Sequence, residues 1–367
     1  MVFQSYIYRR KKQILPISNF KPCKMKKTLK SFLLTLLLLI AVASITSAQN
    51  GHSKSIFDCV LEAEGVPVIK IETNWNKLIN QKMEEEYIPG KITLPCNGQP
   101  VDFDIRVRAR GMMRKQVCFF PPVKVDFKNG QLEKQALDTS IDKLKVVFQC
   151  RTGEANSEFL FREKLSYDLY RVVNPDYFVH HKLVKFECYD EGKVKYTLDG
   201  LFVEDEGEIA DRMGGKVIES GKVMVPALDK DNYLKMVFFQ YMIGNTDWSI
   251  PNKHNVEMVK VPAVAKVIPI PYDFDYAALV GTPYAVPHES LPIKSIYERY
   301  YMGHGVTEPE ALSTAKFFMS KKDELMKVVD DFTLLDEKSR SSVKKFLNPF
   351  FEMIESEKVV KKTFVQQ

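Results

Sequence analysis

The chain has 367 residues, of which 45% are hydrophobic and 27% charged, and this composition excludes a disordered, low-complexity or collagen-like protein. Its formal net charge is +6, but residues 1–48 carry nine Lys and Arg and no Asp or Glu, so the rest of the chain has a net charge of −3. Because the part of the chain after residue 48 is not basic, it has no electrostatic attraction to a phosphate backbone. We therefore expect no nucleic-acid partner.

Residues 1–48 are predicted to form an N-terminal extension and a signal peptide. Lysines follow Met25, residues 32–43 form an apolar run of signal-peptide length, and small residues end at Ala48. The apolar run is short for a membrane span. We therefore expect cleavage before Gln49, no stable membrane span afterwards, and an exported protein in the periplasm, outside the cell or on its surface. An uncleaved membrane anchor is the alternative.

The cysteines of the chain after residue 48 indicate disulfides. Export brings a chain into an oxidising compartment, where disulfides form. The five cysteines are widely spaced and include no C-x-x-C pair of the kind found in zinc ribbons and redox sites. Cys118 and Cys150 each lie at or near the end of an apolar, strand-like segment. We predict that these two cysteines pair.

Residues 49–205 are expected to form a β-rich lobe with one helix. Apolar and polar residues alternate over 101–108, as they do in a half-buried strand. Apolar residues recur every three or four positions over 157–173, which is typical of a helix, and Asn174-Pro175 ends it. Further strands are predicted at 122–127 and 144–148, in a hairpin over 184–198, and at 200–204.

Residues 206–367 are expected to form a mainly helical lobe. An apolar stripe over 233–242 predicts a helix that ends at Gly244, a residue suited to a helix C-cap. Two more amphipathic helices are predicted, and two short strands precede them: the helices span 309–332 and 336–354, and the strands 256–261 and 266–270. The predicted fold class is therefore α+β, with a β-rich N-lobe and a helical C-lobe.

The polar residues between these predicted elements form the strongest candidate site. Asp247, Asn252 and Asn255 lie in a loop after a helix, and Asp273 and Asp275 follow a strand. Phosphoryl transfer needs a carboxylate that orients the attacking hydroxyl, and oxygen ligands that hold Mg²⁺ on the nucleotide phosphates. The five-residue step from Asp247 to Asn252 matches the kinase pattern D-x-x-x-x-N. The alternative is turn chemistry, because Asp and Asn are common turn formers.

Over about residues 100–280 the sequence resembles the spore-coat CotH-type kinases, an atypical branch of the protein-kinase-like fold. The resemblance rests on the order of six short motifs: Arg110-Gly111, Phe161-Arg-Glu-Lys-Leu165, Gly200-Leu-Phe-Val-Glu204, Asn245-Thr-Asp247, His254-Asn255 and Tyr272-Asp-Phe-Asp275. It implies a two-lobed kinase-like fold, with Asp247 as the catalytic carboxylate. It also implies that Asn255 and Asp273 hold Mg²⁺ or Mn²⁺, and that Asp275 supports them or a second metal. Asn252 stays open as the metal ligand in place of Asn255.

A kinase-like site also needs a basic residue on the phosphates and an acid that orients it. Arg110, Lys124 and Lys145 are the basic candidates, and Glu163 and Glu204 are the acidic ones. The expected function is Mg²⁺-dependent transfer of the γ-phosphoryl of ATP to a hydroxyl of a protein or another acceptor. The chain has no glycine-rich loop in its first half, and an exported protein meets little ATP. The alternative is therefore a non-catalytic pseudokinase, an envelope or surface binding protein.

Overall fold

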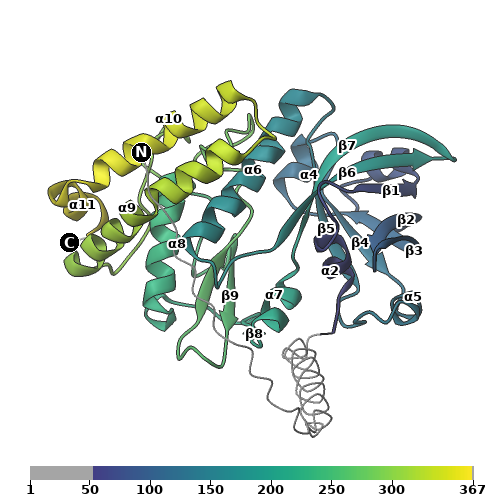
Figure 1. Ribbon diagram of the computed structural model, residues 1–367, viewed down its shortest axis with the longest axis horizontal. Coiled ribbons are helices and arrows are strands. Elements are labelled where there is room, and N and C mark those ends of the chain that lie inside the picture. The colour runs from purple at the N-terminus through teal and green to yellow at the C-terminus, as the bar shows by residue number, and fades with distance from the viewer. Residues whose placement is uncertain (1–52, 366–367) are drawn as a thin grey trace, which may run out of the picture. The chain divides into compact units, whose positions relative to one another are not determined.

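The structure of the protein is a computed structural model that describes residues 53–365 (Figure 1). The predicted signal peptide, its cleavage site and the boundary at residue 48 lie outside the described residues. Two hydrophobic cores organise the described chain. One fills the interior of a β-barrel, and the other lies among the later helices.

The barrel contains seven strands in the order β1-β2-β3-β4-β5-β7-β6. Neighbouring strands are antiparallel, except that β6 pairs in parallel with β1 and so closes the sheet on itself. The strands are β1 (Val68–Thr73), β2 (Ile88–Cys96), β3 (Gln99–Ala109), β4 (Val123–Phe127), β5 (Lys143–Phe148), β6 (His181–Asp190) and β7 (Lys193–Val203). The predicted strands 101–108 and 144–148 are thereby confirmed as parts of β3 and β5, and the predicted strand 122–127 is confirmed as β4, which begins one residue later.

The predicted two-lobed kinase-like fold is wrong, because the first half of the chain forms a closed mixed barrel. Closure depends on β1, where Ile69 stands opposite Phe186 of β6. Alternation of apolar and polar residues shows that a strand has one buried face, but it does not show which strand lies beside it. The expectation of a single helix in this half is also wrong. Four short helices were missed: α2 (Ile56–Leu61), α3 (Trp75–Asn80), α4 (Met113–Val117) and α5 (Asn129–Lys134).

Aromatic side chains fill the barrel. Phe148 and Phe186 have ring centroids 4.9 Å apart, and Trp75 from α3 packs edge-on against Phe148. Gly200 on β7 leaves the space for one of these rings, because a Cβ there would lie 2.4 Å from the ring of Phe186. The glycine of the predicted 200–204 segment is thus a packing requirement of the barrel interior.

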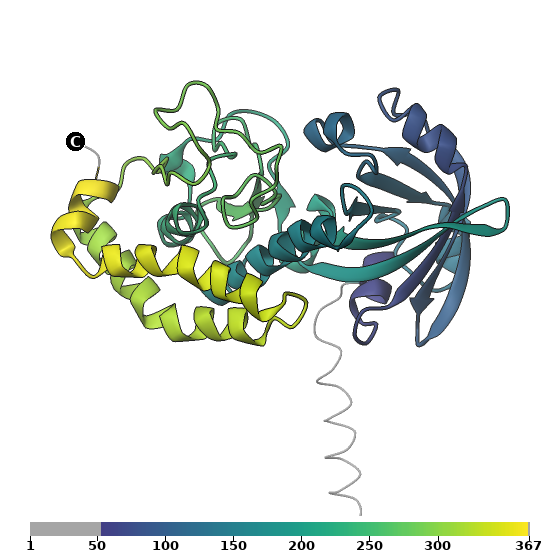
Figure 2. The same cartoon turned by 90° about the horizontal axis from the view of Figure 1, so that it is seen from above.

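The outer face of β7 and the long helix α6 (Glu154–Val173) pack on the second core. α6 begins three residues before the predicted start, and Figure 1 shows it between the barrel strands and the last helices. In Figure 2 the helices α9 and α10 run side by side. The remaining helices are α7 (Glu206–Arg212), α8 (Lys230–Ile243), α9 (Glu308–Asp331), α10 (Glu337–Ile354) and α11 (Glu357–Phe364), with a 3-10 turn at Val225–Ala227.

A small sheet stands among these helices, in the order β10-β9-β8. Its strands are β8 (Lys216–Val217), β9 (Val256–Lys260) and β10 (Ile268–Pro271). β9 and β10 form the predicted short hairpin, and α9 and α10 confirm the two predicted late helices. β7 ends at Val203 and α7 begins at Glu206, so the barrel strands end beside the domain boundary expected at 205.

Two disulfides join described residues, Cys59 with Cys96 and Cys118 with Cys150. The second confirms the predicted pair. Cys188 keeps a free thiol and is buried in the barrel. The two disulfides are compatible with an exported protein. Between residues 53 and 365, no helix combines the length and the apolar character that a bilayer crossing requires.

Candidate functional site

The loop that carries Asp247 begins at the end of α8. Gly244 caps that helix in the left-handed conformation, with φ 66°, and a Cβ there would lie 2.8 Å from Cβ of Ala278. The Asn245 side-chain oxygen accepts a hydrogen bond of 3.0 Å from the backbone N–H of Asp247. This turn directs the chain away from α8. Asn245 is buried, so the position of Asp247 is set from inside the core.

Asp247 is held by two side chains from the far end of the same loop. Nε2 of His254 lies 3.0 Å from Oδ1 of Asp247, and the Asn255 amide donates to Oδ2 at 3.0 Å. The hydrogen bond to Asp247 raises the pKa of His254 above its usual value. With one third of its side chain exposed, Asp247 keeps its carboxylate open to a partner from solution.

The structure brings Asn255, and not Asn252, to Asp247. Backbone hydrogen bonds of 3.0 Å in both directions join Ser249 to His254, so residues 250–253 form a turn outside this pair. Asn252 lies exposed in that turn, where its N–H donates to the Ser249 hydroxyl at 3.4 Å. The five-residue spacing that favoured Asn252 therefore places this residue in a turn. The chain comes back to the Asp247 side chain only at Asn255.

Asp273 enters the site from β10. The backbone N–H of Tyr272 donates to the carbonyl of Asn255 at 3.1 Å, so Asn255 and Asp273 lie at the same end of the β9–β10 hairpin. Both residues have left-handed backbone conformations, with φ 53° at Asn255 and 55° at Asp273. Such conformations cost a non-glycine residue about 1 kcal/mol or more and gather at functional sites.

A buried ion-pair network surrounds Arg114, which sequence analysis missed. Its Nε donates to Asp275 at 2.8 Å, and its Nη2 donates to Glu163. The hydroxyl of Tyr284 also donates to Asp275, at 2.8 Å. These groups come from α4, α6 and the loop after β10. No hydrophobic pattern marks α4, and a single arginine beside Lys115 carries no signal in the sequence.

The acidic groups around Arg114 outnumber it, and their pKa values reflect this crowding and their burial. Burial raises the pKa of Glu163, and its Oε1 is buried without a hydrogen-bond partner among the described residues. Burial also raises the pKa of Asp273 well above its usual range, and the charges of Asp275 and Glu163 raise it further. Burial alone would lower the pKa of Arg114, but the neighbouring acids more than reverse that effect.

A small cavity of about 30 Å³ lies beside Asp273. This volume holds one or two water molecules. Its walls come from the barrel, α6 and the β9–β10 hairpin, and they bring together five of the residues singled out in the sequence: Arg110, Lys145, Glu163, Glu204 and Asp273. Tyr272, the first residue of the Tyr272-Asp-Phe-Asp275 motif, also lines the cavity, as does Glu257, which sequence analysis did not single out.

The basic candidates differ in how they are partnered. Lys145 pairs with Glu206 and, at 3.2 Å, with Asp205. Lys124 stands opposite Lys145 on the neighbouring strand and is not among the residues that line the cavity. The Arg110 guanidinium makes no hydrogen bond or ion pair with any residue from 53 to 365. Arg110 is therefore the basic residue of the cavity that is best able to bind an incoming anion.

The two acidic candidates also differ. Glu204 pairs with Arg212, whose Nε lies 2.7 Å from Oε1, and it also accepts from the backbone N–H of His180 at 2.8 Å. The carboxylate of Glu204 is therefore already bonded to Arg212 and to the backbone of His180. Glu163 pairs with Arg114 instead and keeps one oxygen unpartnered. Neither acid pairs with Arg110, Lys124 or Lys145 in the described structure.

The side-chain oxygens of Asp273 and Asn255 are of the chemical kind that a hard cation prefers. Within residues 53–365 no group of three or more His, Cys, Asp and Glu side chains is arranged to hold a metal ion. Mg²⁺ in nucleotide sites uses one or two protein carboxylates, and phosphate and water oxygens complete its shell. The Asp273 carboxylate and the side-chain oxygen of Asn255 supply ligands of that kind. A cation bound here would favour the charged form of Asp273, whose pKa burial raises.

No protein-family model matches the chain, and no curated protein matches its sequence. The function of this site must therefore follow from its own residues.

Proposed function

We propose that the protein is an exported, Mg²⁺-dependent phosphotransferase that moves the γ-phosphoryl of ATP to a hydroxyl of a protein or another acceptor, in the periplasm or outside the cell. The observation that carries the proposal is the meeting of Asp247 and Asp273 at one end of the β9–β10 hairpin, through Asn255. The order of short motifs that resembles the CotH-type kinases supports the same reaction.

In this proposal each residue has a separate task. Asp247 accepts the proton of the acceptor hydroxyl while the hydroxyl oxygen bonds to the γ-phosphorus, and the bond from that phosphorus to ADP breaks. His254 and Asn255 hold the Asp247 carboxylate in place. Asp273 and Asn255 would bind Mg²⁺, which neutralises phosphate charge when it is present. Arg110 would contact a phosphate oxygen.

The cavity beside Asp273 must widen to admit a nucleotide. Small-molecule sites have volumes of roughly 300–1,000 Å³, far above the volume found here. Lys145, which lines the cavity, crosses from the barrel to pair with Glu206 at the start of α7. Nucleotide phosphates would compete with Glu206 for Lys145. The proposal therefore includes release of Lys145 from Glu206 on binding.

A second function is favoured by the position of Arg114. Its guanidinium already places a fixed positive charge between Glu163 and Asp275. If an arginine takes the place of a metal ion, the side chains of the site keep their arrangement, but metal-dependent catalysis is lost. On this view the protein is a non-catalytic pseudokinase that binds a partner in the envelope or on the cell surface.

Calorimetric titration of the full chain with Mg–ATP tests the proposal, together with a measurement of ADP formation. Asp273→Asn should weaken binding at least roughly tenfold, because it removes the charged metal ligand. Asp247→Asn should bind normally and lose roughly 10²–10⁴-fold in turnover, because it removes the base. Asp211→Asn, an exposed carboxylate on α7, is the matched control and should change neither.

The outcomes separate the two functions. Saturable binding that requires Asp273, with ADP formation that requires Asp247, supports the phosphotransferase. Binding with no ADP formed under any condition favours the non-catalytic protein. No binding of Mg–ATP, in a chain that unfolds cooperatively, contradicts the proposed nucleotide site.

A further inference from the structure

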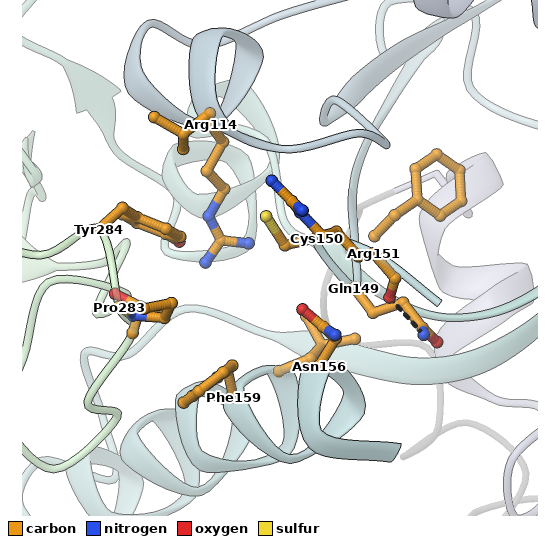
Figure 3. Close-up of a pocket in the computed structure, with 12 residues that line it drawn as sticks. Arg114, Gln149, Cys150, Arg151, Asn156, Phe159, Pro283 and Tyr284 are labelled. Carbon is orange, nitrogen blue, oxygen red and sulfur yellow. Dashed lines mark hydrogen bonds between the residues drawn. The ribbon is translucent and has the colours of Figure 1, made fainter. Parts of the chain in front are cut away.

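A second cavity of about 390 Å³ is lined by Arg114 (Figure 3). We call it the arginine pocket and define it by Arg114, Gln149, Arg151, Asn156, Phe159 and Tyr284. It shares no lining residue with the cavity beside Asp273. Its volume lies in the range of small-molecule sites.

The charged groups of the arginine pocket are cationic. Arg114 and Arg151 line it, and no Asp or Glu of the described chain does. The guanidinium of Arg114 points into the cavity, opposite Asn156 and Phe159 from α6 (Figure 3). Asp275 and Glu163 use its Nε and Nη2, and its Nη1 makes no hydrogen bond within residues 53–365. One donor of a nearly buried arginine is therefore left for a ligand.

Because Asp275 and Glu163 already offset Arg114, Arg151 provides the positive charge that stays unpaired among the described residues. Its guanidinium makes no hydrogen bond or ion pair with the part of the chain that the structure describes. Its backbone is fixed, because the side-chain amide of Gln149 donates to the carbonyl of Arg151 at 2.8 Å. Gln149 is itself buried and accepts a 2.7 Å hydrogen bond from the N–H of Asp199 on β7. The position of Arg151 is thus set by the barrel.

The disulfide between Cys118 and Cys150 joins the two segments that carry the arginines. Cys118 directly follows α4, which holds Arg114, and Cys150 directly precedes Arg151. The N–H of Phe120 donates to the carbonyl of Cys150 at 3.1 Å and ties the same segments again. The pocket is therefore preformed, which reduces the entropy lost when a ligand binds.

From this geometry we infer that the arginine pocket binds a small anion with a flat apolar body. Guanidinium groups recognise carboxylate and phosphate oxygens in their own plane. Phe159 and Tyr284 supply apolar surface on two sides, and Asn156 adds an amide (Figure 3). An aryl phosphate or an aryl carboxylate has this combination of charge and shape. The inference does not depend on the proposed function of the Asp273 site.

Calorimetric titration of the full chain with phenyl phosphate, benzoate and benzyl alcohol tests it. Both anions share the recognised chemistry, and benzyl alcohol keeps the ring without the charge. Arg151→Gln should weaken anion binding roughly tenfold to a hundredfold, as expected for a hydrogen bond to a charged group. Arg151 is exposed, so this variant should fold. Arg171→Gln removes an exposed arginine at the other end of α6 and should have no effect.

Each outcome decides the question. Saturable binding of either anion that weakens in Arg151→Gln supports the pocket, and the tighter anion shows whether phosphate or carboxylate is preferred. Equal binding of benzyl alcohol, an unchanged affinity in Arg151→Gln, or no saturable binding of either anion would overturn the inference.

Discussion

Arg114 and Asp275 stand 161 residues apart in the sequence and form an ion pair in which the exposed fractions of the two side chains are 11% and 6%. The same guanidinium pairs with Glu163 on α6, so one side chain joins a short helix beside the barrel, the long helix and the loop after β10. A group with buried partners on both sides cannot be lost without leaving charges unpaired.

Arg114→Gln should therefore destabilise the fold by about 3–5 kcal/mol, the range for breaking a buried ion pair. Urea unfolding measures the change. Arg108→Gln is the matched control, because its ion pair with Glu85 is partly exposed and should cost below about 1 kcal/mol. Equal effects in the two variants would show that the Arg114 network contributes no more than a surface pair.

The pKa of His254 reports on Asp247. The hydrogen bond that His254 donates to Asp247 raises that pKa, and the negative charges of Asp247, Asp273 and Asp275 add to the effect. Asp247→Asn should lower the pKa of His254 towards its ordinary value, because a neutral amide stabilises the imidazolium less. Titration by NMR measures it, and Asp211→Asn should leave it unchanged. An unaltered pKa in Asp247→Asn would mean that the two side chains do not interact in solution.

The two asparagines of the loop should differ in their effect on stability. Asn255→Ala removes both hydrogen bonds to Asp247 and places alanine at φ 53°, so we expect a loss of about 2 kcal/mol. Asn252→Ala changes an exposed turn and should stay within about 0.5 kcal/mol of the parent. Thermal unfolding compares them, and a larger loss in Asn252→Ala would contradict the described loop.

Glu208 should make stability depend on pH. Its carboxyl group is buried on α7 beside the hydroxyl of Ser55, and burial raises its pKa to about 8 from an ordinary 4.5. Between these values the folded chain binds one more proton than the unfolded chain, so the free energy of unfolding falls as pH rises, by up to about 1.4 kcal/mol per pH unit. The neutral isostere Glu208→Gln should lose this dependence.

Urea unfolding of wild type and Glu208→Gln from pH 5 to pH 8 measures the difference, and the variant should become relatively more stable as pH increases. Glu133→Gln changes an exposed carboxylate and should follow the wild type. Parallel curves for wild type and Glu208→Gln would show that Glu208 titrates alike in the folded and unfolded chains.

Gly200→Ala should cost about 1–3 kcal/mol, because the new Cβ would lie 2.4 Å from the buried ring of Phe186 and force it to move. Gly130→Ala, on α5, meets open space and should gain about 0.5–1 kcal/mol from helix propensity. Chemical denaturation of both variants gives the comparison. A neutral Gly200→Ala would show that the barrel interior has room for a methyl group.

The sequence predicted those parts of the molecule that depend on neighbouring residues. The alternation in β3 follows from its single buried face, and the convergence of Asp247 with Asp273 follows from a loop and a hairpin that lie close together in the chain. Barrel closure could not be predicted, because β1 and β6 meet only through tertiary packing. The partners of the charged residues were also hidden, because ion pairs form between side chains that are close in space and often far apart in the sequence. Lys145, for example, pairs with Glu206 and not with the predicted Glu163 or Glu204.

The parallel pairing of β1 with β6 has a consequence for how the chain assembles. One edge of β1 pairs with β2, but its other edge is covered only when β6 brings Phe186 beside Ile69. A chain that emerges N-terminus first must therefore keep the edge of β1 exposed while four further strands and α6 are added. Unpaired edges recruit other strands. The chain is therefore most exposed to wrong strand pairing until residue 203 has been synthesised. A chaperone that covers strand edges would protect it best during that time.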